Sequence, residues 1–316
     1  MRNRRVSVIG GSGFIGRYVV KRLAERGAVV TVVSRHATEA QFLKPMGDVG
    51  QIALIDAGLD DEARLAAALA GSSAVVSSVG ILYERGRQRF QALHVDGPAR
   101  VARLAAAAGA KHFVHVSALS ADAQAASAYA RSKAMGEAAV KAAFPAATIL
   151  RPSLVFGPED DFFNRFAGLA RVSWALPLVG GGATRFQPVY VGDVADAVMA
   201  ALDRPEAQGR TYELGGPAVL SFRELMELLL REIGRRRVLV TLPSGLASAA
   251  AVFMQFMPKP LLTPDQVKLL QKNTIVTPGA PGLAELGITP TALQLILPTY
   301  LARFHRGGRA TLRPAV

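Results

Sequence analysis

The feature that most constrains this chain is a glycine-rich segment near its start. The segment follows a short apolar run, Val6–Ile9, and leads into a longer amphipathic run, Phe14–Arg26. It reads Gly10-Gly11-Ser12-Gly13-Phe14-Ile15-Gly16. Glycines at this spacing let the backbone approach a phosphate closely, and the N–H groups at a helix N-terminus attract its negative charge. The segment therefore predicts a strand, a phosphate-binding turn and a helix, with a tight structural turn as the alternative.

The first half of the chain alternates short β-rich runs with longer alanine-rich runs. The strand runs are continuously apolar, as expected where helices cover both faces of a sheet. Strands are expected at 6–9, 29–33, 74–76, 112–116 and 148–150, and helices at 14–26, 62–69, 96–108 and 128–143. This alternation predicts an α/β fold with a doubly wound parallel sheet of the Rossmann type. We expect this core to occupy residues 1–158 and a smaller mixed α/β lobe to occupy residues 159–316.

Composition narrows the classes of protein to consider. Half of the 316 residues are hydrophobic, which suffices for a core and excludes disorder as the main state. The absence of cysteine excludes a disulfide scaffold, a zinc–cysteine site, an iron–sulfur cluster and a thiol nucleophile. The formal net charge of +13 favours an anionic partner, and the chain ends in a basic tail. The arginines of that tail are Arg303, Arg306, Arg309 and Arg313.

The end of the second predicted strand bears on which dinucleotide is bound. An NAD site usually has an acid here for the ribose 2′-hydroxyl, but no acid lies between Glu25 and Glu39. Arg35 instead suits the 2′-phosphate of NADP(H), with Ser34 and Arg17 assisting. NADPH is therefore the expected cofactor, and a solvated loop charge is the alternative role for Arg35.

A tyrosine and a lysine four residues apart, Tyr129 and Lys133, open another predicted helix and share one of its faces. An ammonium group close to a phenol favours the phenolate and lowers a pKa that starts near 10. Such a pair can act as acid and base between a carbonyl and an alcohol. Ser117 follows the strand run 112–116, where a third hydrogen-bonding group can lie. Tyr129, Lys133 and Ser117 are therefore the candidate catalytic residues, and Lys133 is also expected to reach the nicotinamide ribose.

Taken together, these residues resemble the short-chain dehydrogenase/reductase superfamily, in its extended or atypical branch. Further matches are the runs at 78–80, 151–158 and 187–195. The resemblance implies that Ser78 and Gly80 line the cofactor trough and that Pro152 and Ser153 lie near the nicotinamide. Members of this branch often carry an acid or amide after the third strand for the adenine. The matching position here is Gly58, so contact with the adenine through the backbone alone is expected there.

A narrower resemblance covers nearly the whole chain. The runs at 80–84, 86–90, 156–164 and 281–288 are similar to those of the dehydrogenase-like accessory subunits of respiratory complex I and their bacterial relatives. In that family the fold holds NADPH, usually with no assigned turnover, and docks near the membrane end of the peripheral arm. The resemblance implies the same cofactor and partners among the complex I subunits. It also implies a peripheral location on the cytoplasmic face of a bacterial inner membrane, or a cytoplasmic one.

An uncharged stretch at residues 238–258 bears on membrane contact. Pro243, Ser244 and Gly245 interrupt it and leave the run 246–257, which is too short to cross a bilayer. This run is apolar nearly all round, and the uncharged stretch follows three arginines at 235–237. We expect a helix here that contacts an anionic membrane surface or a membrane protein. The alternative is an ordinary core helix of the C-terminal lobe.

Three functions remain open from the sequence alone. The first is an NADPH-holding accessory subunit of membrane-bound NADH:quinone oxidoreductase whose cofactor is structural or regulatory. The second is a soluble NADPH-dependent reductase or epimerase that uses Tyr129 and Lys133, and the third is an NADP(H)-sensing regulatory protein. The five histidines show no metal-ligand spacing, and the basic patches lack interleaved aromatic residues. Neither a metal site nor a nucleic-acid partner is therefore expected.

Overall fold

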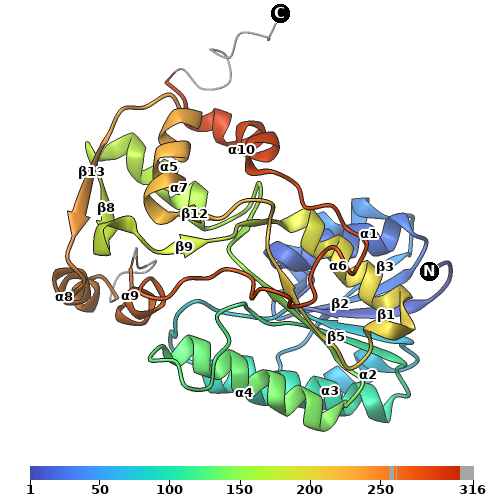
Figure 1. Ribbon diagram of the computed structural model, residues 1–316. Coiled ribbons are helices and arrows are strands. Elements are labelled where there is room, and N and C mark those ends of the chain that lie inside the picture. The colour runs from blue at the N-terminus through green and yellow to red at the C-terminus, as the bar shows by residue number, and fades with distance from the viewer. Residues whose placement is uncertain (256–259, 261, 307–316) are drawn as a thin grey trace, which may run out of the picture. The chain divides into compact units, whose positions relative to one another are not determined.

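The computed structural model describes residues 1–255, 260 and 262–306. Its contacts divide the chain into two compact units that interleave along the sequence (Figure 1). The first unit comprises Met1–Pro152, Val191–Leu214 and Thr277–Thr289. The second comprises Ser153–Tyr190, Gly215–Val276 and the described residues from Pro290 onward. This division differs from a single boundary after residue 158, because two segments from the second half of the sequence belong to the first unit.

The first unit is built on a seven-stranded sheet with the strand order β11-β6-β5-β4-β1-β2-β3. All neighbouring strands are parallel; in register, Val6 of β1 lies between Val30 of β2 and Ala74 of β4. The strands are β1 Arg5–Ile9, β2 Val29–Ser34, β3 Ile52–Asp56, β4 Ala74–Ser77, β5 His112–Val116, β6 Thr148–Pro152 and β11 Thr211–Leu214. The order reverses at β1, so the loops after β1 and β4 part at this point and leave room for a ligand. The predicted doubly wound α/β fold is confirmed.

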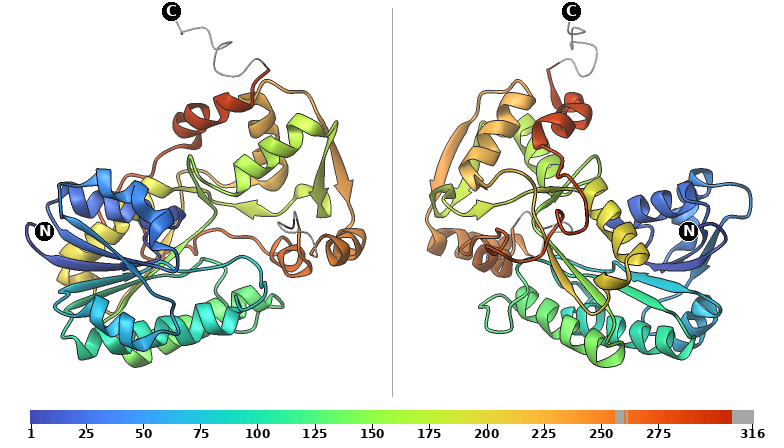
Figure 2. Two further views of the ribbon diagram at one scale, coloured as in Figure 1. Left: turned by 180° about the vertical axis from the view of Figure 1, so that it is seen from behind. Right: turned by 45° about the vertical axis from the view of Figure 1, so that its right-hand side comes forward.

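Helices cover both faces of this sheet (Figures 1 and 2). One face carries α1, Phe14–Glu25, and α6, Val191–Asp203. The other carries α2, Glu62–Leu69, α3, Gly97–Ala107, and α4, Ala128–Ala143. The buried cluster on this second face joins side chains of the strands and all three helices, among them Phe113, Leu65, Val101 and Val140. Cover on both sides explains why the strands are apolar at successive positions rather than at alternate ones.

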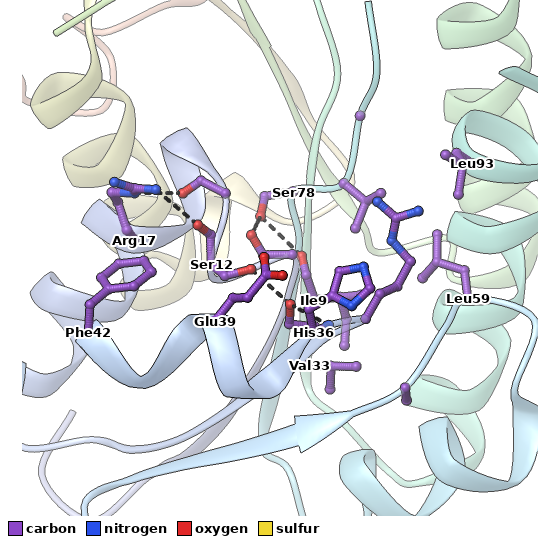
Figure 3. A pocket seen from close by; sticks show the side chains of 17 residues that line it. Ile9, Ser12, Arg17, Val33, His36, Glu39, Phe42, Leu59, Ser78 and Leu93 are labelled. Atoms are coloured by element: carbon purple, nitrogen blue, oxygen red, sulfur yellow. Dashed lines mark hydrogen bonds between the residues drawn. The ribbon is translucent and has the colours of Figure 1, made fainter. Parts of the chain in front are cut away.

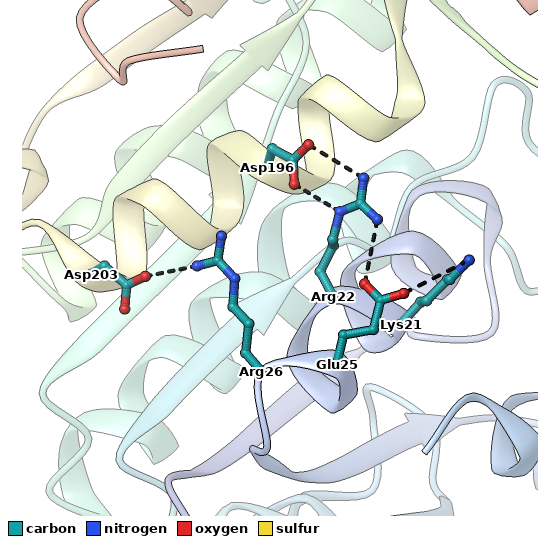
Figure 4. Close-up of polar contacts among 6 residues, drawn as sticks. All are labelled: Lys21, Arg22, Glu25, Arg26, Asp196 and Asp203. Carbon is teal, nitrogen blue, oxygen red and sulfur yellow. Dashed lines mark hydrogen bonds and ion pairs between the residues drawn. The ribbon is translucent and has the colours of Figure 1, made fainter. Parts of the chain in front are cut away.

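Ion pairs link α1 to α6 (Figure 4). Arg22 donates from Nε to Asp196 Oδ1 over 2.7 Å, and Arg26 pairs with Asp203 over 2.8 Å. Glu25 adds pairs with Lys21 and Arg22 on α1 itself. These contacts attach a helix from the second half of the sequence to the first helix of the chain.

The second unit has an apolar core formed by three helices, α5 Phe162–Val172, α7 Phe222–Glu232 and α10 Leu293–Leu301. Helix α7 begins at a capping box of Ser221 and Glu224. Short strand pairs border the core. They are β8 Ala175–Val179 with β13 Val238–Leu242, β9 Arg185–Phe186 with β12 Leu220–Ser221, and β7 Val155–Phe156 with β10 Val189–Tyr190.

Helix α8, Ser244–Met254, lies within the predicted apolar run, of which positions 256 and 257 fall outside the described residues. Ala247 and Ala251 are buried against the unit near α9, Pro264–Leu269. Leu246 and Phe253, in contrast, are 62% and 78% exposed. The helix therefore has one covered face and one apolar face in the open. The described part of the chain contains no helix with both the length and the hydrophobicity that a membrane crossing requires.

Candidate functional site

The glycine loop joins the carboxyl end of β1 to the first turn of α1. Gly10 has a φ of 81°, a left-handed conformation that favours glycine. A Cβ atom on Gly16 would lie 2.2 Å from the Gly10 carbonyl oxygen, so α1 can approach the loop this closely only with glycine there. Gly13 is the N-cap residue and no side chain caps this helix. The N–H groups of the first turn are thus placed to bind an anion.

A crevice of about 450 Å³ opens beside this loop, at the carboxyl ends of β1 and β2 (Figure 3). The residues predicted for cofactor binding that line it are Gly10, Ser12, Gly13, Arg17, Ser34, Arg35, Ser78 and Gly80. Four more, Gly11, Phe14, Ile15 and Gly16, belong to the loop and helix but do not form its wall. Pro152 ends β6, and Ser153 begins the second unit, where its hydroxyl donates to the Thr274 carbonyl over 2.8 Å.

Hydrogen bonds hold the crevice wall in place (Figure 3). The Ser12 and Ser34 hydroxyls lie 2.9 Å apart, which joins the loop to the end of β2. Ser78 donates to the Ile9 carbonyl over 3.0 Å. Arg17 donates to the Ser12 carbonyl over 3.2 Å and lies over the Phe42 ring, 4.8 Å from its centroid. Arg17 therefore braces the loop, and Phe42, which the sequence gave no reason to select, completes that wall.

A second hollow of about 310 Å³, called the annex here, shares Arg35, Leu59 and Leu93 with the crevice. The rest of its wall consists of Asp60, Arg87, Gln88, Ala92, Asp96 and Arg100. Asp60 is an acid that follows β3, two residues beyond Gly58. A Cβ on Gly58 would lie 2.3 Å from Asp60 Oδ1, so glycine at 58 leaves space for this carboxylate. The annex thus presents a carboxylate beside Gly58.

Tyr129 and Lys133 lie on α4 as predicted, but their electrostatics differ from the expectation. Lys133 is 3% exposed, and its ammonium donates to the Val116 carbonyl over 3.0 Å. Burial lowers the pKa of Lys133 to about 8, although Glu137 opposes this shift. Burial raises the pKa of Tyr129 to about 12. The predicted lowering of the tyrosine pKa is wrong for this arrangement, because burial desolvates the phenol and disfavours the phenolate.

Ser117 contacts a carboxylate that the sequence did not single out. Its hydroxyl donates to Glu137 Oε1 over 2.5 Å. Arg151 holds the same carboxylate through two hydrogen bonds of 2.9 and 2.6 Å and also pairs with Glu213. The hydroxyl of Ser117 is therefore directed to Glu137 in this structure. The spacing of four from Lys133 was the signal that could have identified Glu137.

His94 connects the site to a neighbouring loop. It lies in a π-helical segment, Gln91–Asp96, and its Nε2 accepts from the Ile81 N–H over 3.0 Å. Its Nδ1 lies 2.8 Å from the Ser132 hydroxyl, which itself donates to the Tyr129 carbonyl. The ring is therefore the neutral tautomer with the proton on Nδ1, and burial lowers the pKa of His94 to about 3. Helical periodicity cannot reveal this residue, because a π-turn does not follow a 3.6-residue repeat.

Within residues 1–255, 260 and 262–306, no group of three or more histidine, aspartate or glutamate side chains is placed to hold a metal ion. The site is thus composed of the glycine loop, the crevice, the annex and the hydrogen-bonded group around Tyr129.

Several known proteins are similar to the chain. The model of the NAD dependent epimerase/dehydratase family matches residues 6–215. A mitochondrial protein of Arabidopsis thaliana, NADH dehydrogenase (ubiquinone) 1 alpha subcomplex subunit 9, is 36% identical over 314 residues, which cover 96% of this chain and 78% of the relative. The Mus musculus protein of the same name is 34% identical over 292 residues, 92% of this chain and 77% of the relative. A ceramide reductase of Caulobacter vibrioides is 32% identical over 206 residues, 63% of this chain and 61% of that protein.

Solved structures agree on the fold. The dTDP-glucose 4,6-dehydratase DesIV of Streptomyces venezuelae, crystallised with NAD, has a TM-score of 0.71 at 21% identity, over 97% of this chain and 98% of that chain. The protein gox2253 has a TM-score of 0.72 at 22% identity, over 96% of this chain and 98% of that chain. The chain therefore belongs to the NAD dependent epimerase/dehydratase family and, within it, to the family of the alpha subcomplex subunit 9 proteins of NADH dehydrogenase.

Proposed function

We propose that this protein is an accessory subunit of a membrane-bound NADH:quinone oxidoreductase. The observation that carries the proposal is the similarity over nearly the whole chain to proteins named as subunits of such complexes in a plant and a mammal. A fungal relative, the 40 kDa subunit of the Neurospora crassa NADH–ubiquinone oxidoreductase, covers 98% of this chain at 29% identity. Similarity of this extent includes the second unit as well as the sheet of the first unit.

The cofactor we propose is NADPH, held in the crevice beside the glycine loop. The family of the chain is one of NAD-dependent proteins, which supports a dinucleotide in this place. Arg35 lines the crevice directly after β2 and supports the choice of the phosphorylated form. In this proposal the first turn of α1 binds the pyrophosphate, and Lys133 and Ser78 contact the nicotinamide half.

We propose further that the cofactor has a structural or regulatory role. A hydride transfer to a carbonyl needs a proton donor and a hydrogen bond to the carbonyl oxygen. The Ser117 hydroxyl donates a hydrogen bond to Glu137, and burial raises rather than lowers the pKa of Tyr129. In this arrangement Glu137 engages the Ser117 hydroxyl and Tyr129 is a weaker acid than a phenol in water, while the phosphate loop is fully formed; these observations support a role other than turnover.

The experiment is purification of a tagged, full-length protein from native membranes after gentle detergent extraction. We expect subunits of the quinone-reducing NADH dehydrogenase to copurify and mass spectrometry to detect bound NADP(H). Recovery solely as a free soluble protein would contradict the proposed assembly. Recovery within the complex without any nucleotide would contradict the proposed cofactor.

A soluble NADPH-dependent reductase or epimerase is the second candidate. The observation in its favour is that Tyr129, Lys133 and Ser117 are all present, and a ceramide reductase is among the relatives. NADPH oxidation with carbonyl substrates by the isolated protein, lost on Tyr129→Phe, would support this candidate. Unchanged turnover in that variant would exclude Tyr129 as the acid.

A further inference from the structure

Two arginines from distant parts of the sequence line the same hollow. Arg35 follows β2 and borders both the crevice and the annex, and Arg87 borders the annex from the loop at residues 80–90. Both side chains are exposed at the surface of the first unit. We propose that Arg87 is the second arm of a clamp in which Arg35 and Arg87 together bind the 2′-phosphate of NADPH. The inference rests on the proposed NADPH function and assigns a residue to its specificity.

The annex has three other charged side chains, and two of them, Arg100 and Asp96, already have hydrogen-bond partners. Arg100 donates to the Leu59 carbonyl over 2.5 Å and lies 3.6 Å from a Glu62 carboxylate oxygen. Asp96 accepts a hydrogen bond from Gln91 over 2.7 Å. Asp60 remains as a negative charge on the same wall, on the side of Gly58. The annex is thus mixed in charge, and its available cations are the two arginines.

Neither arginine is engaged elsewhere in the described chain. Across residues 1–255, 260 and 262–306, the ion pairs and side-chain hydrogen bonds include neither the Arg35 nor the Arg87 guanidinium group. By comparison, Arg89 of the same loop lies 3.6 Å from Glu84. Both guanidinium groups are therefore left to attract a bound dianion.

The loop that carries Arg87 has a defined conformation. Arg85 and Gln88 exchange two backbone hydrogen bonds of 3.0 and 2.9 Å, which places Gly86 and Arg87 at the tip of a tight turn. Gly86 adopts the φ of 56° that such a turn requires. The Glu84 carboxylate accepts from the Phe90 N–H over 2.7 Å, and His94 holds Ile81 at the other end. Arg87 is therefore presented to the annex by a braced turn rather than by a free segment.

A 2′-phosphate matches this pair in charge and in donors. A phosphate monoester carries a charge of about −1.5 to −2 at pH 7 and three acceptor oxygens. Planar guanidinium groups bind such oxygens in pairs, so two arginines from different directions can both engage one phosphate. NADH has a hydroxyl at the same position and offers Arg87 no charged partner.

The test compares the affinities of NADPH and NADH for the full-length protein and its Arg87→Ala, Arg35→Ala and Arg89→Ala variants. We expect Arg87→Ala to weaken NADPH binding about tenfold, which corresponds to about 1.4 kcal/mol, and to leave NADH binding unchanged. Arg35→Ala should have at least the same effect. Arg89→Ala, on the same loop but paired with Glu84, is the matched control and should resemble the wild type. Titrations with 2′,5′-ADP and 5′-AMP should give the same pattern without the nicotinamide.

The outcomes separate this inference from the function on which it rests. An unchanged preference for NADPH in Arg87→Ala, or an equal loss in Arg89→Ala, overturns the role of Arg87 and leaves the NADPH proposal standing. Equal affinity of the wild type for NADPH and NADH overturns the clamp altogether. Binding of neither nucleotide by folded wild-type protein overturns both the cofactor proposal and the inference.

Discussion

A single neutral ring, His94, joins three parts of the first unit. It accepts from the Ile81 N–H on one side, contacts Ser132 on the other, and stacks on Phe90 with ring centroids 5.2 Å apart. Tyr129 meets the same ring edge to face, with centroids 5.5 Å apart. A charge on His94 would place a second cation near Lys133 and remove the acceptor for Ile81. The local structure therefore depends on this ring staying neutral.

Stability should consequently depend on pH through His94. A histidine in the unfolded chain gains its proton near pH 6.5, whereas burial lowers the pKa of His94 in the folded protein to about 3. Between these values the unfolded state binds more protons, so the free energy of unfolding falls as the pH falls, by up to about 1.4 kcal/mol per pH unit. Urea unfolding of the wild type and of His94→Gln from pH 7 to 4 measures this slope.

The His94→Gln variant should be less stable than the wild type at pH 7 but should lose less stability as the pH falls. His115, whose pKa burial also lowers, contributes in the same direction and remains present in both proteins. His36→Gln, which alters an exposed ring of the same unit, serves as the control and should keep the wild-type slope. An identical slope in His94→Gln and the wild type would contradict the assignment.

Prediction from sequence succeeded for residues whose role depends on local spacing. The sequence placed the glycine loop, Ser34 and Arg35 beside one another correctly, because a phosphate loop and the end of the next strand are adjacent in any doubly wound sheet. The position of Glu137 at Ser117 and Arg151 was not predicted, nor was the annex that Asp60 and Arg87 line, because these contacts join residues distant in the sequence. The direction of the Tyr129 pKa shift was also wrong, since burial is a tertiary property that spacing alone does not reveal.

At the scale of the elements, the ion pair between helices α1 and α6 is open to a quantitative test. The Arg22–Asp196 pair joins residues 174 positions apart over 2.7 Å, and both side chains are about one-third exposed, at 32% and 35%. Partial burial makes such a pair stronger than a fully solvated one, yet solvent still screens it. We expect a double-mutant cycle with Arg22→Ala and Asp196→Ala, measured by urea unfolding, to give a coupling energy of about 0.5–1 kcal/mol.

The pair of Arg64 and Asp61 provides the control cycle. This pair lies at the start of α2, with 3.4 Å between Arg64 Nε and Asp61 Oδ2. The two side chains are 64% and 39% exposed. Its coupling energy should be smaller than that of Arg22–Asp196, because both partners are more solvated and already neighbours in sequence. Equal coupling in the two cycles would show that the α1–α6 pair is an ordinary surface contact.

On the scale of the whole molecule, the net charge of +13 and the open apolar face of α8 favour the same partner. An anionic lipid surface satisfies both, since it attracts arginines and accepts Leu246 and Phe253. We expect the full-length protein to bind vesicles containing anionic lipid more tightly than neutral ones, and less tightly as salt increases. The double variant Leu246→Ser/Phe253→Ser should bind at least tenfold more weakly, because each side chain loses about 1.5–3 kcal/mol of burial.

The matched control removes two exposed apolar side chains from the first unit. Val49 and Leu82 are 107% and 46% exposed, and their replacement by serine should leave vesicle binding unchanged. An equal loss in both double variants would contradict a specific role for α8. Absence of binding to every vesicle would favour a protein partner at that face instead.

The interleaved course of the chain has a consequence for synthesis. The seventh strand of the sheet, β11, and the segment Thr277–Thr289 follow long excursions into the second unit. While the polypeptide emerges from the ribosome, six strands can assemble early, but the edge beside β6 stays open until residues 211–214 appear. Translation therefore exposes an unpaired strand edge for an extended interval, and a chaperone that shields such edges would be needed most during that window.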